Sequence, residues 1–130
     1  MSFNSRYTQL FYSFIVGIIA GLLGGLLGIT GTVIVIPLAI VFGLFENYKT
    51  AIGTILFTYD PILSIFAVLE YAKKNYIDYL IAATLFVSYV IGSYIGSKYN
   101  NYFPVKTLKY ITAFILFILS LYVFYNAYHL

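Results

Sequence analysis

Long apolar runs separated by short polar stretches make up almost the whole chain. The first run extends from residue 10 to residue 45. A single helix of that length would be about 54 Å long, whereas the hydrocarbon core of a membrane is about 30 Å thick. The run must therefore break, and the glycine-rich stretch 28–32 allows it. We predict one helix over about 9–28 and another over about 32–44, which is short enough for a half-span or re-entrant helix.

Three further apolar segments follow, at about 49–71, 77–97 and 105–127. Asp60-Pro61 lies near the middle of the first, where we predict a kink, because proline removes a backbone hydrogen bond. Pro104 precedes the last segment and suits the first turn of a helix. The pattern predicts a single all-α transmembrane domain over residues 1–130, with a broken or re-entrant first hairpin and three full spans.

The composition places this bundle in a membrane. Hydrophobic residues make up 62% of the chain and charged residues 8%, whereas a soluble surface alone would be about a quarter to a third charged. The fifteen tyrosines gather near the segment ends, as amphipathic rings do at the head-group level. No small-residue cleavage site precedes the first span, so we expect that span to stay in the mature protein.

The polar loops predict an orientation. Whether the first two helices are two crossings or one re-entrant hairpin, the turn at 46–49 lies on the side of the N-terminus. If the last three segments all cross, the two termini then face opposite sides of the membrane. Five cations would then lie on the N-terminal side, namely Arg6, Lys49, Lys98, Lys106 and Lys109. The other side would hold two, Lys73 and Lys74. The positive-inside rule therefore predicts a multi-pass protein of the cell membrane with a cytoplasmic N-terminus.

Several classes of function are not expected. The charges are scattered singly, so nucleic acid is not a predicted partner. The chain has no cysteine, and its one histidine, His129, is the penultimate residue, so we expect no metal site. It shows no phosphate-binding loop and no catalytic constellation. We therefore expect neither an enzyme nor a cofactor.

Glycines recur at intervals of four and three along the first run, which places them on one helix face. Absent side chains let another helix approach closely in a membrane. A second small-residue face lies in the segment 77–97. We assign helix packing to both faces, which consist of Gly17, Gly21, Gly24 and Gly25 in the first run and Ser88, Gly92 and Gly96 in the later segment.

The stretch Gly28-Ile29-Thr30-Gly31-Thr32 supports a second interpretation besides packing. A break at membrane depth frees backbone groups, which are tolerated only inside protein or beside a wet cavity. The first N–H groups of the following helix carry the positive end of its dipole, and the two threonines add hydroxyl donors. Transporters build mid-membrane sites in this way. The stretch therefore predicts a site for a small anion.

The motif GGLLGITGTVIVIPL at 24–38, with AIGT at 51–54 and the loop at 71–78, resembles one repeat of the TauE/SafE family of sulfite-exporter-like permeases. Weaker matches at 92–96 and 104–109 extend the resemblance to about residues 12–125. It implies a secondary transporter of small sulfur-containing anions such as sulfite or sulfonates. Family members usually carry two such repeats, so we expect a homodimer or a second half-length chain. Thr30 and Thr32 stand where the family commonly has glycines.

Two further elements are candidates for the same site. Gly53-Thr54 resembles the Gly-Thr element of the family, so Thr54 is a candidate second donor, with helix capping or packing as the alternative. Asp60 is not part of the family pattern. An ionisable residue at mid-membrane marks a functional site by default. Asp60 either couples proton movement to transport or has a structural role. We place the neighbouring Pro61 and the motif proline Pro37 in the same coupling or structural group.

Two alternatives from other classes stay open. The glycine faces could serve only to dock partner helices, which would make the chain a non-transporting membrane scaffold or subunit. The second alternative is a small dimeric channel or exporter of cations, in which Asp60 is the counter-ion.

Overall fold

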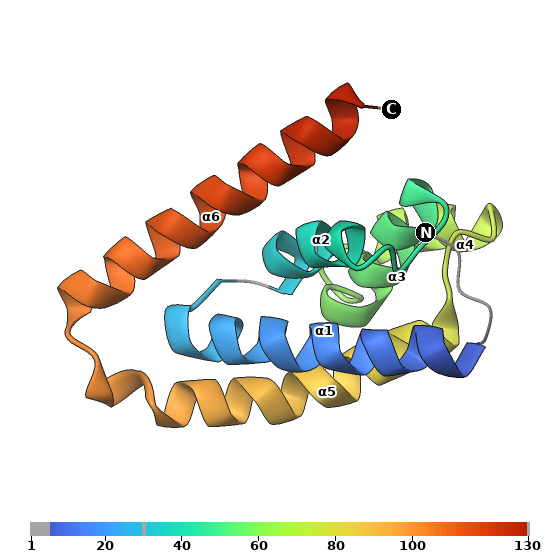
Figure 1. Cartoon of the computed structure of the whole chain (residues 1–130). Helices are drawn as coiled ribbons and strands as arrows, with labels where there is room; N and C mark the ends of the chain where they lie inside the picture. Colours follow the sequence, from blue (N-terminus) through green and yellow to red (C-terminus); the bar gives the residue numbers. More distant parts are fainter. Residues whose placement is uncertain (1–5, 30, 130) are drawn as a thin grey trace.

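The computed structural model describes residues 6–29 and 31–129, and within these residues all regular structure is helical. The predicted all-α class is confirmed. Among the described residues, three stretches are long and apolar enough to span a membrane, and one shorter apolar helix accompanies them. The elements in chain order are α1 (Arg6–Leu27), α2 (Gly31–Val41), α3 (Tyr48–Tyr59), α4 (Ile65–Lys73), α5 (Tyr79–Lys98), the 3₁₀ turn η1 (Asn100–Tyr102) and α6 (Val105–Tyr128) (Figure 1).

Helices α1 and α5 lie side by side and run in the same direction (Figure 1). Gly21 of α1 faces Gly92 of α5. A Cβ added at Gly21 would lie 2.5 Å from the carbonyl oxygen of Tyr89, and one at Gly92 would lie 2.5 Å from that of Ile18. The two backbones therefore touch, which is the close approach that small residues allow between membrane helices.

The same seam continues along both helices, because Gly17 faces Ser88 and Gly96 faces the backbone of Leu22. Gly25 faces the backbone of Ser93, and Gly24 faces the hydroxyl of Tyr89. The two small-residue faces of the sequence thus meet each other within one chain.

The predicted break in the first apolar run is confirmed, and Gly28 makes it. Gly28 has a φ of +75°, and its N–H donates to the carbonyl oxygen of Gly24 at 2.8 Å. A single bond of this kind from a left-handed residue is the αL stop signal of a helix. The following helix, α2, is also followed by a glycine in the left-handed conformation, Gly43, with a φ of +61°.

The segment 49–71 is two helices, which corrects the prediction of one kinked span. Asp60 ends α3 with φ −128° and ψ 44°, outside the helical region. The cause is Pro61, because a proline ring disfavours helical geometry at the preceding residue and supplies no N–H of its own. A turn at 61–64 then leads into α4. The three helices long enough to span are therefore α1, α5 with η1, and α6.

Helices α3 and α4 form a hairpin that returns to the end of the molecule where it began. The side chain of Arg6, at the start of α1, bonds Asp78, which precedes α5. The amide of Gln9 donates to the carbonyl oxygen of Leu44 at 3.0 Å, which places the α2–α3 turn at that end as well. The starts of α1, α3 and α5 are therefore neighbours.

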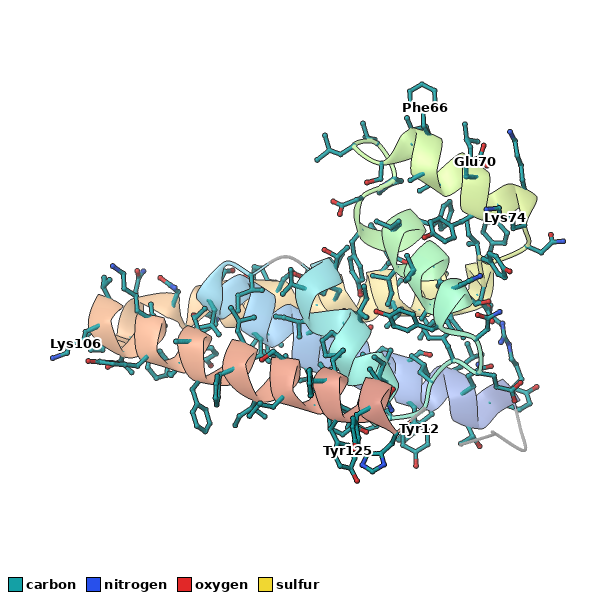
Figure 2. The ribbon with its side chains drawn as sticks, turned by 90° about the horizontal axis from the view of Figure 1, so that it is seen from above. Tyr12, Phe66, Glu70, Lys74, Lys106 and Tyr125 are labelled. Carbon is teal, nitrogen blue, oxygen red and sulfur yellow. The ribbon has the colours of Figure 1, made fainter. Side chains whose placement is uncertain are left out.

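This topology corrects the predicted placement of the termini on opposite sides. Helix α1 begins, and α6 ends, on the side away from the α5–α6 connection (Figure 1). Figure 2 shows Lys106 and Lys74 toward opposite ends of the molecule. Arg6, Lys49, Lys73 and Lys74 thus share one end, and Lys98, Lys106 and Lys109 the other. Four cations against three give the positive-inside rule almost no bias, so a cytoplasmic N-terminus stays a prediction without that support.

The core lies among α1, α2, α3 and α5. Its fully buried side chains include Val16 of α1, Ile34 of α2, Ile55 of α3 and Leu85 of α5. Helix α6 differs, because none of its described residues is buried. It is apolar along its length and leans on α2 and α1 only in part.

Candidate functional site

The start of α2 meets the end of α3 inside the bundle. Gly31 is buried at the first position of α2, and a Cβ added there would lie 3.0 Å from the ring of Tyr59, the last residue of α3. The glycine therefore lets an aromatic ring lie directly on the first turn of α2. We call this meeting point, formed by Gly31, Thr32, Tyr59, Asp60 and Tyr89, the break site.

Two tyrosines form one wall of the break site. The ring of Tyr59 lies 4.9 Å, centroid to centroid, from the ring of Tyr89 on α5. The Tyr59 hydroxyl donates to the carbonyl oxygen of Leu85 at 3.4 Å. The sequence does not distinguish either residue, because fifteen tyrosines along the chain fit the simpler pattern of interfacial belts.

The break site lies at an intermediate depth in the bundle. Helix α3 starts at the end that holds Arg6 and Asp78, and its 12 residues extend about 18 Å from there. Helix α1, with 22 residues, is about 33 Å long. The end of α3 and the start of α2 therefore meet near the middle, where interrupted transporter helices form their sites.

Asp60 lies at the edge of this site, next to Tyr59. Its backbone N–H donates to the carbonyl oxygen of Leu56 at 2.9 Å, and its carbonyl oxygen accepts from the N–H of Ser64 at 3.0 Å. Asp60 thus both ends α3 and starts the turn toward α4. Asp60 is half-buried at this position.

Gly53 and Thr54 lie away from the break site. The hydroxyl of Thr54 is fully buried and accepts from the N–H of Asp78 at 2.8 Å. Gly53 packs against the carbonyl oxygen of Tyr76 and the side chain of Tyr71. Both residues fasten α3 to the loop between α4 and α5. The structure does not bring them together with Gly31.

The other predicted binding residues divide into three cases. Gly28 is exposed, and its positive φ rather than a contact explains the glycine. Thr32 is half-buried in the first turn of α2. Thr30 lies outside the described residues. A role for these residues in substrate binding remains a prediction.

The two prolines have structural consequences. Pro37 lies inside α2, where it lacks the N–H that would bond the carbonyl of residue 33, so this short helix is weakened at its centre. Pro61 is exposed in the turn after α3. The carbonyl groups freed near such positions are one reason why α2 depends on its neighbours for support.

An ionic network at one end of the bundle was missed in the sequence. Arg6 donates to Asp78 at 2.7 Å and to Gln9 at 2.6 Å. Asp78 also caps α5 by accepting from the N–H of Ile81 at 3.2 Å. Burial alone would raise the pKa of Asp78, but the hydrogen bonds from Arg6 and from the N–H groups at the start of α5 lower it below the ordinary value. The carboxylate is therefore ionised at neutral pH.

A second contact that the sequence does not reveal is a hydrogen bond at the C-terminal end of α1. The side-chain amide of Asn100 donates to the carbonyl oxygen of Leu26 at 2.7 Å. The last carbonyls of a helix have no partner within it, so this bond satisfies one of them next to the break. The sequence indicates that a hydrogen-bond donor is needed at this point, because α1 must end there. It does not indicate which residue supplies that donor.

The comparison with family models gives one match. The model described as "Sulfite exporter TauE/SafE" matches residues 12–129. Comparison with curated proteins and with solved structures gave no significant match. The match covers α2 to α6 and all but the first residues of α1. With three helices in its described part able to span a membrane, the chain is a multi-pass membrane protein, and it belongs to the sulfite exporter TauE/SafE family of membrane transporters.

Proposed function

We propose that the chain is one half of a dimeric secondary transporter that moves small sulfur-containing anions, such as sulfite or sulfonates, across the cell membrane. One observation carries the proposal: in a chain of this family, the start of α2 meets the ring of Tyr59, the last residue of α3, inside the bundle. The first N–H groups of a helix have no partner within it and lie at the positive end of its dipole. They supply the donors that an oxyanion needs.

Each residue of the break site has a part in this proposal. The first turn of α2 and the Thr32 hydroxyl bind the oxyanion. Gly31 lets the ring of Tyr59 lie directly on that turn, and the rings of Tyr59 and Tyr89 form an apolar wall that excludes water. Asp60 is the group that couples anion transport to proton movement.

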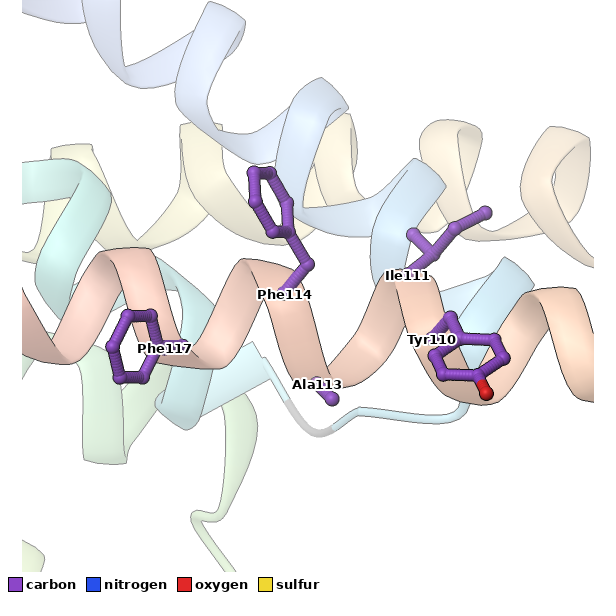
Figure 3. Close-up of a pocket in the computed structure, with 5 residues that line it drawn as sticks. All are labelled: Tyr110, Ile111, Ala113, Phe114 and Phe117. Atoms are coloured by element: carbon purple, nitrogen blue, oxygen red, sulfur yellow. The ribbon is translucent and has the colours of Figure 1, made fainter.

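Helix α6 supports the dimer in this proposal. An open, shallow groove lies along one face of α6 and is lined by Tyr110, Ile111, Ala113, Phe114 and Phe117 (Figure 3). Its lining is almost wholly apolar. A second copy of the chain, or a second half-length chain, covers this face and completes the pathway. The small difference in cations between the two ends permits either a parallel or an antiparallel pair.

The glycine seam weakens the scaffold alternative. That alternative needs glycine faces that are free to dock partner helices, but Gly21 and Gly92 face each other within one chain. The close-packing surfaces are thus already occupied.

The test is uptake of sulfite, a sulfonate and thiosulfate into proteoliposomes, with and without a pH gradient. We expect uptake of at least one anion that Asp60→Asn uncouples from the gradient. Glu70→Gln is the matched control, because Glu70 is an exposed carboxylate on α4 whose partner is Lys73. If none of the three anions enters liposomes that hold intact dimer, the proposal is wrong. Uptake of a lipophilic cation in their place would favour the cation exporter.

A further inference from the structure

A cavity lies between the end of α2, the α2–α3 turn and the last turns of α6, away from the break site. Its volume is about 490 Å³, within the range of small-molecule pockets. Ile40 and Val123 contribute apolar wall, whereas Glu46, Tyr48 and Asn126 contribute polar groups. The cavity is thus amphipathic, and two elements far apart in the sequence build it.

The position of this cavity is the head-group level of the membrane. Glu46 lies in the polar turn at the end of the bundle that also holds Arg6, and the two residues line a neighbouring polar cavity of about 410 Å³. Tyr125, Tyr128 and His129 mark the matching end of α6. Aromatic residues of this kind gather at the membrane interface. The apolar part of the lining comes from α2 and α6, through Ile40 and Val123.

The charge of the cavity selects its occupant. Among the described residues that line the cavity, Glu46 is the one carboxylic acid, and none is a lysine or arginine. Within the described part of the chain, Glu46 forms no ion pair. An ammonium group that can donate hydrogen bonds satisfies such a carboxylate better than a quaternary ammonium, which has no N–H. The Asn126 amide and the Tyr48 hydroxyl are donors for a neighbouring phosphate.

We propose that this cavity binds a zwitterionic phospholipid whose head group carries a primary ammonium. Glu46 accepts from the ammonium, Asn126 and Tyr48 donate to the phosphate, and the first part of one acyl chain lies between Ile40 and Val123. The lipid would fasten α6 to α2 where the protein itself leaves α6 without a buried residue. This proposal is independent of the transported substrate.

Native mass spectrometry of the purified protein with added phosphatidylethanolamine, phosphatidylcholine or phosphatidylglycerol tests it. We expect retention in that order, and Glu46→Gln should reduce the preference for phosphatidylethanolamine over phosphatidylglycerol about two- to fivefold, the scale of an exposed ion pair. Glu70→Gln, a carboxylate outside the cavity, should leave the preference unchanged.

A second variant pair tests the cavity rather than the charge. Ala127→Phe fills the cavity from α6 and should abolish retention of the lipid. Ser120→Phe adds the same side chain at an exposed position of α6 outside the cavity and should leave retention intact. Equal retention by Ala127→Phe, an unchanged preference in Glu46→Gln, or strongest retention of the anionic lipid would each overturn the proposal.

Discussion

Gly21→Ala tests whether the contact between α1 and α5 organises the molecule. Gly21 lies opposite Gly92, and an added Cβ would meet backbone atoms: the carbonyl oxygen of Tyr89 at 2.5 Å and the nitrogen of Ser93 at 2.8 Å. Backbone cannot rotate away as a side chain does. One methyl group must therefore push two helices apart.

The size of the effect follows from these distances. Ordinary contact begins near 3.4 Å, so the alanine is short of space by about 0.9 Å. Forced overpacking lowers the free energy of unfolding by about 1–3 kcal/mol, and the better helix propensity of alanine offsets up to about 1 kcal/mol of this loss. Gly31→Ala is the matched control, because its Cβ would meet only the Tyr59 side chain, at 3.0 Å. We expect Gly21→Ala to be less stable than Gly31→Ala by about 1–2 kcal/mol.

The assay is unfolding by SDS in mixed micelles, followed by circular dichroism. A double-mutant cycle adds a sharper test, because Gly92→Ala opens the same gap from the other side. The second alanine should cost less than it does alone, with a coupling of at least about 0.5 kcal/mol. If Gly21→Ala is as stable as the wild type, or if the two alanines are additive, the helices do not pack as described.

Three other predictions concern the polar groups and the topology. Asp78→Asn should flatten the acid limb of the stability curve: because the folded pKa of Asp78 is below the ordinary 3.8, its stabilisation is present above that value and is lost as the pH falls through the folded pKa. An equally steep acid limb in the variant would refute this. Reporters fused to the two termini should fall on the same side of the membrane, and opposite sides would contradict the α3–α4 hairpin. Tyr59→Ala should impair anion uptake more than Tyr59→Phe, which keeps the ring on Gly31, whereas equal losses would assign the effect to the hydroxyl.

The elements themselves were predictable because local rules fix them. The length of the first apolar run required a break, and α1 and α2 end and begin within one residue of the predicted 28 and 32. Asp60-Pro61 was predicted to disturb its helix, but the size of the disturbance was underestimated. A kinked helix and a hairpin share the same local signal, and only the contacts of the Tyr71–Asp78 loop with Gly53 and Thr54 distinguish them.

The site was predictable only in part. The sequence drew attention to Gly31 and Asp60, which lie at the break site, and to Thr54, which lies elsewhere. It gave no reason to choose Tyr59 or Tyr89 among fifteen tyrosines. Residues 31, 59 and 89 come from three helices, so their meeting depends on how those helices pack.

The sequence by itself determined that this is a helical membrane protein, where its first apolar run breaks, and which faces of its helices are small. These properties depend on composition and on spacing along one helix. The tertiary structure alone decided that the two small-residue faces meet each other in parallel, that α3 and α4 return to their starting end, and that Tyr59 covers the start of α2. Such choices compare the packing of segments far apart in the chain, and no local pattern records that comparison.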